Sequence, residues 1–439
     1  MTNEVPSAPD LLIDLIRFDT TNPPGNEEAC IAYLEKRIRQ SGLDTQRLAK
    51  DPARPNLLTR LPGRGLAPPL LLYGHVDVVT ADPREWTHPP FDGVKEDGWI
   101  WGRGALDMKG AVAMMTSAVL HAATRDEPPA GDILLLCLSD EEAGARFGAR
   151  FLVEEHPELF EGIRYAIGEF GGVPLRVAGE TFFAIQVAEK QPCWLQATIR
   201  GPAGHGAKPM RGGAMAKLGQ ALQRLDQKRL PVHISPVVRR MVDTLATHLP
   251  FPKSLVLRLL LRRQLTDRVL SVLGEPGESL EALFRNTANA TSVRGGEKPN
   301  VIPNEVVLGL DGRILPGIPV ETFVEELRAI LGSDAEVDVR LHDPAPTETD
   351  FGMFDLLGEI LIGQEPTAVP LPLLLPGSTD ARFLSSLGIQ TYGFTPMNLP
   401  TEFDFFSTIH GADERVPVEA LKFGATAIGK LLARYGESV

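Results

Sequence analysis

The chain has 439 residues, of which 43% are hydrophobic and 23% are charged, values typical of soluble globular proteins. Its formal net charge is −13 and only 6% of its residues are aromatic, which argues against a nucleic-acid-binding protein. The three cysteines, Cys30, Cys137 and Cys193, are far apart and form no CxxC motif, which argues against a disulfide scaffold and a thiolate zinc site.

The amino-terminal segment has no basic stretch followed by a long apolar run, so no signal peptide is expected. No apolar run approaches the roughly 18–20 residues that span a bilayer, and we expect a cytoplasmic protein without a membrane span. An apolar stripe over 11–16 predicts a first helix, and a second amphipathic helix is predicted over 27–41.

Short apolar strands then alternate with helical sequence. Strands are predicted over 56–61, 70–73, 132–138 and 164–167, with a glycine-rich loop over 102–110 and an alanine- and methionine-rich helix over 111–123. This alternation favours an α/β sheet covered by helices on both faces. Charged residues repeatedly follow the carboxyl ends of the strands, where open α/β sheets place their ligand sites.

The pattern changes near Thr181. Extended sequence over 183–200 is followed by predicted helices at 213–225 and 320–331 and by predicted strands at 290–293, 306–310 and 336–341. This is the strand-helix-strand-strand-helix-strand order of a split βαβ domain. We therefore predict an inserted α+β domain over 183–343, interrupted by Leu- and Arg-rich helical sequence over 231–284. A catalytic α/β domain would combine 1–182 with 344–439, including a strand at 391–394 and a helix at 418–433.

Histidines and acids that follow the apolar strands form the candidate site. They are His75, Asp77, Asp107, Glu141, Glu142, Glu169 and, far downstream, His410. Imidazole and carboxylate ligands suit zinc, and two histidines with three carboxylates suit two ions that share one carboxylate. Two metals about 3.5–4 Å apart can activate a water and polarise a carbonyl together. A spare carboxylate, from Glu141 or Glu142, would then serve as the general base.

Each of these residues also has a simpler structural interpretation. A lone histidine after a strand is more often packed or exposed than a ligand, and Asp107 in a glycine-rich loop could be a turn residue. The acids at 140–142 could simply interact favourably with the dipole at the amino terminus of a helix. Any one of these residues could have a purely structural role. A purely structural role for all of them is less convincing, because each falls at a strand end of one α/β pattern.

Several segments resemble the motifs of the M20 metallopeptidase family, which includes aminoacylases, glutamate carboxypeptidases and related deacylases. The segments stand in the order that the family shows: LLYGHVDVV at 71–79, WGRGALDMKG at 101–110, SDEEAG at 139–144, GEFGG at 168–172, STDARF at 378–383 and IHGADE at 409–414. The opening segment LIRFDTTNPPGNE at 15–27 is also similar. The resemblance covers nearly the whole chain and implies a di-zinc exopeptidase-type catalytic domain, with a mixed sheet flanked by helices.

The resemblance implies two metal sites with one shared ligand. His75, Asp107 and Glu169 would bind one zinc ion. Asp107, Glu142 and His410 would bind the other, so that Asp107 bridges the two ions. Cobalt or manganese could occupy the same sites.

The resemblance also implies the roles of two further acids. Asp77 would orient the His75 ring, and Glu141 would be the general base. A cis peptide bond is expected between Asp107 and Met108, because the family often has one at the bridging acid.

The inserted domain resembles the lid and dimerisation domain of the family. GPAGHGAKP at 201–209 matches its histidine motif, so His205 would stabilise the oxyanion from the partner subunit of a homodimer. Arg313 and Arg382 would bind a substrate carboxylate, although a structural ion pair is an equal alternative for Arg313. Asn286 would contact a carbonyl group.

The implied function is hydrolysis of the amide bond of N-acyl amino acids or of C-terminal residues of small peptides. A dipeptidase or carboxypeptidase that acts only on peptides is the alternative. Two features depart from the common pattern. Phe170 interrupts the usual Glu-Gly-Gly, and the 231–284 insertion resembles in placement that of the carboxypeptidase S and N-fatty-acyl amino acid hydrolase branch. Its leucines could line an acyl pocket or pack the inserted helices: Leu255, Leu257, Leu259, Leu260 and Leu261.

Overall fold

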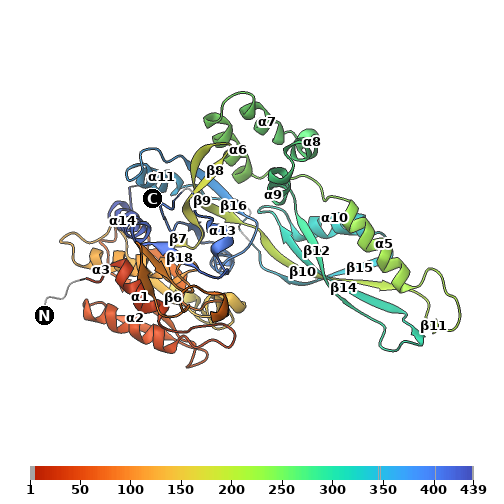
Figure 1. Ribbon diagram of the computed structural model, residues 1–439, viewed down its shortest axis with the longest axis horizontal. Coiled ribbons are helices and arrows are strands. Elements are labelled where there is room, and N and C mark those ends of the chain that lie inside the picture. Colours follow the sequence, from red (N-terminus) through yellow and green to blue (C-terminus); the bar gives the residue numbers. More distant parts are fainter. Residues whose placement is uncertain (1–4, 345, 347, 401, 438–439) are drawn as a thin grey trace. The chain divides into compact units, whose positions relative to one another are not determined.

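A computed structural model describes residues 5–344, 346, 348–400 and 402–437 (Figure 1). The chain divides into two compact units. The first combines Met1–Val187, Asp350–Leu373 and Thr379–Val439, and the second combines Ala188–Thr349 with Leu374–Ser378. Among the described residues, no helix is both long and apolar enough to cross a membrane.

The first unit is built on a nine-stranded mixed sheet. Its strand order is β1-β2-β6-β3-β7-β17-β9-β16, with β8 paired to β9. Strands β6, β3, β7 and β17 are parallel to one another, and β1, β2 and β8 add antiparallel pairs. The strands are β1 Thr45–Leu48, β2 Asn56–Leu61, β3 Leu70–His75, β6 Ile133–Leu138, β7 Tyr165–Gly168, β8 Gly171–Val177, β9 Glu180–Glu189, β16 Pro370–Leu375 and β17 Gln390–Gly393. The expected mixed sheet is confirmed.

Strands β3 and β6 are buried along their whole length because helices cover both faces of the sheet. Alternate side chains of a strand point to opposite faces. Leu71 and Tyr73 join Phe151 of α4 (Ala149–Glu155) and Leu384 of α12 (Ala381–Ser386) in one cluster. The other face is covered by α3 (Lys109–Ala123), which packs against α1 (Ala8–Ile16) and α14 (Val418–Arg434).

Smaller elements complete the first unit. Helix α1 is capped by Ser7, whose Oγ accepts a hydrogen bond from the Asp10 backbone N–H at 3.4 Å. A three-stranded sheet has the order β18-β5-β4. The remaining elements are α2 Glu28–Gln40, β4 Val94–Glu96, β5 Trp99–Trp101, α11 Phe354–Ile362, α13 Phe405–Thr408 and β18 Arg415–Pro417.

The second unit contains a four-stranded antiparallel sheet with the order β12-β14-β10-β15. Along β14, every second residue is buried, and these residues form one core with helices α5 and α10. The order of strands and helices along the chain is that of the predicted split βαβ domain. The elements are β10 Gln191–Arg200, β11 Gly204–His205, α5 Ala214–Gln227, β12 Thr287–Arg294, β13 Val301–Ile302, β14 Glu305–Ile314, α10 Val320–Leu331 and β15 Ala335–His342.

The predicted helical insertion consists of four helices: α6 Pro236–His248, α7 Lys253–Leu260, α8 Arg263–Leu273 and α9 Glu275–Phe284 (Figure 1). Buried Arg285 connects α8 and α9 to the segment before α6. Its Nη1 donates to the Leu230 carbonyl at 2.6 Å, and its guanidinium pairs with Asp267 of α8 and Glu281 of α9. Leu257 and Leu260 are buried, as the packing interpretation expects, whereas Leu255 is 49% exposed.

Three boundaries differ from the predicted ones for identifiable reasons. Strand β3 continues to His75, because His75 pairs with Leu138 of β6. Helix α3 begins at Lys109, inside the expected loop, and the buried Lys109 Nζ donates to the Phe18 carbonyl at 2.7 Å. The extended sequence at 183–200 belongs to two strands, β9 and β10, which are separated at Lys190.

Gly168 controls the position of the residue that follows β7. A Cβ atom at Gly168 would lie 2.1 Å from the Tyr73 ring of β3. We expect Gly168→Ala to lower the free energy of unfolding by about 1–3 kcal/mol, because overpacking forces Tyr73 or β7 to move. Urea denaturation measures this effect. Gly219→Ala is the matched control: its site in α5 is open, so it should stabilise by about 0.5–1 kcal/mol. Equal stability of Gly168→Ala and the unsubstituted chain would contradict the close approach.

Candidate metal centre

The candidate ligands meet at one edge of the first unit's sheet. His75 is the last residue of β3, Glu169 follows β7, and Glu141 and Glu142 lie in the 3-10 turn η2 (Glu141–Ala143) after β6. Because β3, β6 and β7 are parallel, their carboxyl ends face the same edge. The loop before α3 supplies Asp107.

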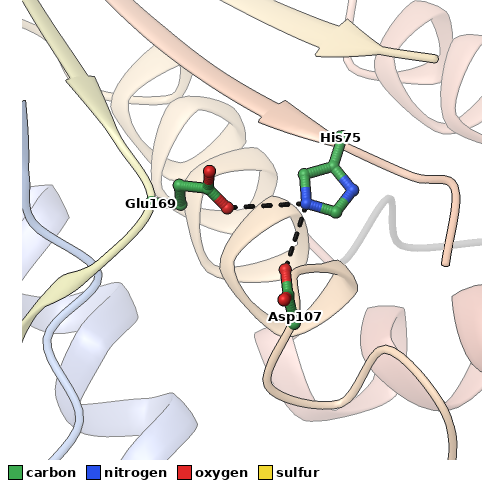
Figure 2. A group of neighbouring side chains, drawn as sticks. All are labelled: His75, Asp107 and Glu169. Atoms are coloured by element: carbon green, nitrogen blue, oxygen red, sulfur yellow. Dashed lines mark hydrogen bonds and ion pairs between the residues drawn. The ribbon is translucent and has the colours of Figure 1, made fainter. Parts of the chain in front are cut away.

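The first group consists of His75, Asp107 and Glu169 (Figure 2). The Nε2 atom of His75 lies 3.1 Å from Asp107 Oδ1 and 3.5 Å from Glu169 Oε2. The three side chains are at most 11% exposed. One atom from each residue lies within 4.8 Å of the others, so a metal ion could replace the ion pairs that join them.

The second group consists of Asp107, Glu142 and His410. The Nε2 atom of His410, the residue two after α13, lies 3.1 Å from Asp107 Oδ2 and 3.4 Å from Glu142 Oε1. The two oxygens of Asp107 therefore face different groups, the arrangement that a bridging carboxylate requires. The His410 side chain is 51% exposed, so this group is open on one side.

The donor set fits divalent cations. Glu142 Oε1 is buried and makes no hydrogen bond within the part of the chain that the structure describes. Pairing with the carboxylates of Asp107 and Glu142 raises the pKa of His410 to about 10. Burial opposes the charged form of His75, yet its hydrogen bonds to Asp107, Asp77 and Glu169 hold its pKa well above the usual value. A metal ion at either group would displace the ring protons, because imidazole ligates only in its neutral form.

Asp77 connects the first group to the turn that carries the two glutamates. It is fully buried, and its Oδ1 and Oδ2 accept the backbone N–H groups of Glu141 and Glu142, each at 3.1 Å. The His75 Nδ1 atom lies 2.9 Å from the Asp77 carbonyl oxygen and 3.5 Å from its carboxylate. Asp77 therefore holds both the His75 ring and the η2 turn in place.

A buried network of charged and polar side chains surrounds Asp77. Arg54 makes a bidentate pair with Glu27, at 2.6 and 3.1 Å, and its Nη1 lies 2.9 Å from Asp140 Oδ1. The Asn22 amide donates to Asp77 at 2.8 Å and to Asp140 at 3.0 Å. Each charged member is thus paired, which buried charges require. The opening segment at 15–27 contributes two of these residues to the site.

Glu414 fixes the loop that carries Asp107. Its buried carboxylate accepts the backbone N–H groups of Gly104, Leu106 and Asp107, at 2.9, 2.6 and 3.1 Å. It also accepts from Arg103 Nη1 at 2.7 Å. The peptide bond between Asp107 and Met108 is cis, as expected.

Two further carboxyl groups lie in the same electrostatic environment. Burial, and the charges of Glu169, Asp380 and Glu142, hold the pKa of Glu141 well above its usual value, against the effect of His75. Burial raises the pKa of Asp380 to about 7, although the positive charge of Arg382 lowers it. Neither carboxylate oxygen of Asp380 makes a hydrogen bond to the described residues. Perturbed acids of this kind concentrate at functional sites.

Three non-glycine residues beside the ligands have left-handed backbone conformations. Asp140 has φ 68°, Phe170 has φ 58° and His410 has φ 61°. Such conformations cost about 1–3 kcal/mol and persist where the surroundings impose them, often at functional sites. Phe170, the residue that departs from the family pattern, occupies one of these positions.

Sequence reasoning missed the supporting residues, although it quoted their motifs. Glu414, Asp140 and Asp380 stand in the segments 409–414, 139–144 and 378–383. Each is an acid in the same motif as an assigned site residue, and each is buried. An acid in a motif that is not needed as a ligand could therefore have been assigned to backbone support.

The remaining predicted residues are placed as follows. Arg382 is in the first unit, where its guanidinium lies 4.6 Å from the centre of the Phe383 ring. In the second unit, Arg313 pairs with Asp311 at 2.9 Å and donates to Ser378 Oγ at 3.1 Å. His205 and Asn286 also belong to the second unit.

Asn286 and His205 differ in their surroundings. Asn286 is fully buried: its amide donates to Glu326 at 3.0 Å and its carbonyl accepts the Leu315 N–H at 2.9 Å. Both ends of its side chain are therefore used within the second unit, and its contact with a substrate stays a prediction. His205 is exposed on β11, and its Nδ1 accepts the Ala207 N–H at 3.1 Å.

The chain is similar to known proteins over most of its length. The sequence model of peptidase family M20/M25/M40 matches residues 71–434. Probable carboxypeptidase S-like 2 of Dictyostelium discoideum is 29% identical over 371 residues, which cover 81% of this chain and 69% of that protein. Aminoacylase-1 of Sus scrofa is 26% identical over 430 residues, which cover 95% and 92%. The crystal structure of an M20 family metallo-carboxypeptidase from Sulfolobus solfataricus has the same fold, with a TM-score of 0.67 at 17% identity, covering 97% of this chain and 98% of that one.

The shared position of Asp107 makes a distinct prediction about metal content. Asp107→Ala removes a ligand from both groups and should abolish binding of about two zinc ions per chain, whereas His410→Ala should leave about one. Elemental analysis after equilibration with zinc measures the content. Asp126→Ala, at an exposed acid, is the control and should bind as the unsubstituted chain does. A full metal ion retained by Asp107→Ala would contradict the bridging role.

Proposed function

This chain belongs to the M20/M25/M40 family of peptidases, and on this basis we propose that it hydrolyses the amide bond of N-acyl amino acids or of the C-terminal residue of small peptides. The chain is thus a hydrolytic enzyme. The observation that carries the proposal is the position of Asp107, which presents one oxygen to each of two histidine-carboxylate groups.

In this proposal the two groups hold two divalent cations. His75, Asp107 and Glu169 would bind one, and Asp107, Glu142 and His410 the other. Zinc is the metal that best suits this donor set, and cobalt or manganese are the alternatives. When bound, the cations would supply a water of lowered pKa and a positive charge for the carbonyl oxygen.

Glu141 would act as the general base. Its backbone is held by Asp77, and its raised pKa suits a carboxylate that accepts a proton from water and returns it to the leaving amine. Because Asp77 also holds Glu142, the base and a metal ligand share one support. Asp77 would therefore set the distance between the base and the reacting water.

His205 would stabilise the oxyanion that forms on the substrate carbonyl. Its Nδ1 accepts a hydrogen bond from the Ala207 N–H, so the proton of a neutral ring lies on Nε2, where it can be donated. The resemblance of 201–209 to the family's histidine motif supports a role in trans. We therefore propose a homodimer in which the second unit supplies His205 to the partner's site.

Arginine side chains would select substrates with a free carboxylate. Arg382 is the stronger candidate, because its charge acts on buried Asp380 in the first unit. Arg313 already pairs with Asp311, and it would have to bind a carboxylate in addition or in exchange. Asn286 would contact a carbonyl group only if one of its two hydrogen bonds were released. We further expect the enzyme to work in the cytoplasm.

The general base can be tested by one isosteric substitution. Glu141→Gln should lower kcat by about 100- to 10,000-fold, because the amide cannot accept a proton from water. Metal content should stay at that of the unsubstituted chain. Amine release from an N-acyl amino acid measures the rate, and Glu154→Gln, at an exposed site on α4, is the control. Near-normal turnover in Glu141→Gln would assign the base elsewhere.

The substrate class can be determined with a panel of substrates that differ only in the group on the amino side of the scissile bond. N-acetyl, N-long-chain-acyl and dipeptide substrates that share one C-terminal amino acid should be compared by kcat/KM on the same zinc-loaded sample. We expect the acyl substrates to be preferred, as for an aminoacylase. A preference for dipeptides would favour the carboxypeptidase or dipeptidase alternative, which the similarity to a carboxypeptidase S-like protein also supports.

A further inference from the structure

The helical insertion carries an exposed apolar and basic surface that the proposed reaction does not use. Phe251 is 78% exposed and Leu255 is 49% exposed. Val272, at the end of α8, is 82% exposed. These are three of the twelve exposed large apolar side chains among the described residues, and they fall within 22 consecutive positions.

Phe251 lies in the turn that leads into α7, and Leu255 lies in the first turn of that helix. The Ser254 N–H donates to the Pro250 carbonyl at 3.2 Å and the Val256 N–H donates to the Pro252 carbonyl at 3.1 Å, so helical hydrogen bonding begins before Lys253. Phe251 and Leu255 are therefore both exposed at the amino-terminal end of α7. Leu257 and Leu260 are buried, so α7 packs on the other helices through its opposite side.

The same segment is basic within an acidic chain. Residues 251–272 contain five cations (Lys253, Arg258, Arg262, Arg263 and Arg268) and one acid, Asp267, whereas the whole chain has a net charge of −13. All five cations are exposed. Asp267 is paired with Arg229 and Arg285, so it does not neutralise them. Within the described part of the chain, none of the four arginines forms an ion pair.

We propose that α7 and the start of α8 form a docking surface for an anionic lipid membrane. We call it the α7 surface and define it by Phe251, Leu255, Arg258 and Arg262. Phe251 and Leu255 would insert between headgroups, and the arginines would pair with anionic lipids.

The chemistry of the surface favours a bilayer over a second protein. A standard protein interface buries about 800 Å² on each partner around an apolar core. The α7 surface instead has two separate apolar side chains among cations on a short helix, which suits shallow insertion at a charged interface. Such a surface gives weak, reversible binding. The proposal goes beyond amide hydrolysis and does not depend on the metal centre.

Vesicle flotation of the full-length protein tests the proposal. The protein should bind vesicles that contain phosphatidylglycerol at least about tenfold better than vesicles of phosphatidylcholine alone, because each cation near an anionic surface contributes roughly fivefold. Raising the salt to about 1 M, where the screening length falls to about 3 Å, should remove most of this preference. Equal binding to both vesicle types, or no binding to either, would overturn the proposal.

Two variants separate the apolar from the electrostatic contribution. Phe251→Asp should reduce binding about tenfold or more by removing an inserted ring, and Arg258→Glu with Arg262→Glu should reduce it about 20-fold or more. Leu66→Asp, at a 71% exposed leucine of the first unit, is the matched control and should bind normally. Retained binding in both α7 variants would place the lipid contact elsewhere.

The competing occupant, a second copy of the chain, has a separate readout. Light scattering should give the same mass for Phe251→Asp and the unsubstituted protein. In addition, a Phe251→Trp variant should show a blue shift of its fluorescence on adding anionic vesicles, and Leu66→Trp should not. A lower mass for Phe251→Asp, without a vesicle-dependent shift, would identify a self-association surface instead and overturn the proposal.

Discussion

The structure of the first unit depends on the concentration of carboxylates at one buried edge of its sheet. Asp77, Asp107, Glu142 and Glu169 each lie within 3.5 Å of a ring nitrogen of His75 or His410, so four carboxylates surround two imidazole rings. Buried charges of one sign repel strongly unless cations accompany them. The raised pKa values of His75 and His410 are the local response to this excess. A pair of metal ions would balance this excess further, and the two oxygens of Asp107 face one histidine each.

Rigid support of that edge comes from polar groups rather than from the apolar core. The ligands stand at loop starts, where packing alone would leave them free to move. Asp77 accepts two backbone N–H groups of the η2 turn, and Glu414 accepts three from the loop before α3. Both acids are fully buried. Carboxylates thus have two positions here: some belong to the candidate ligand groups, and others hold the backbone that carries those groups.

The local sequence pattern predicted individual helices and strands better than it predicted how they are arranged in the sheets. The strand at 56–61 and the helix at 320–331 have the predicted bounds, because apolar runs and helical periodicity are properties of neighbouring residues. The sequence placed the candidate ligands in two groups that the structure brings together, because their motifs combine residue type with position at a strand end. The role of Glu414 was missed because its partner, Gly104, is 310 residues away. Likewise, no local signal tells that β17 lies between β7 and β9.

The two units differ in how freely their residues can be substituted. In the first unit, the candidate ligands and their supports are coupled, so a change at Asp77 or Glu414 would disturb several ligands at once. The helical insertion of the second unit is held by the contacts of Arg285 and by packing among its own helices. Its outward residues, such as Phe251 and Arg258, are exposed and can therefore change without cost to the core. A docking surface of the kind proposed for α7 suits such a segment, because its residues can change while the candidate site stays intact.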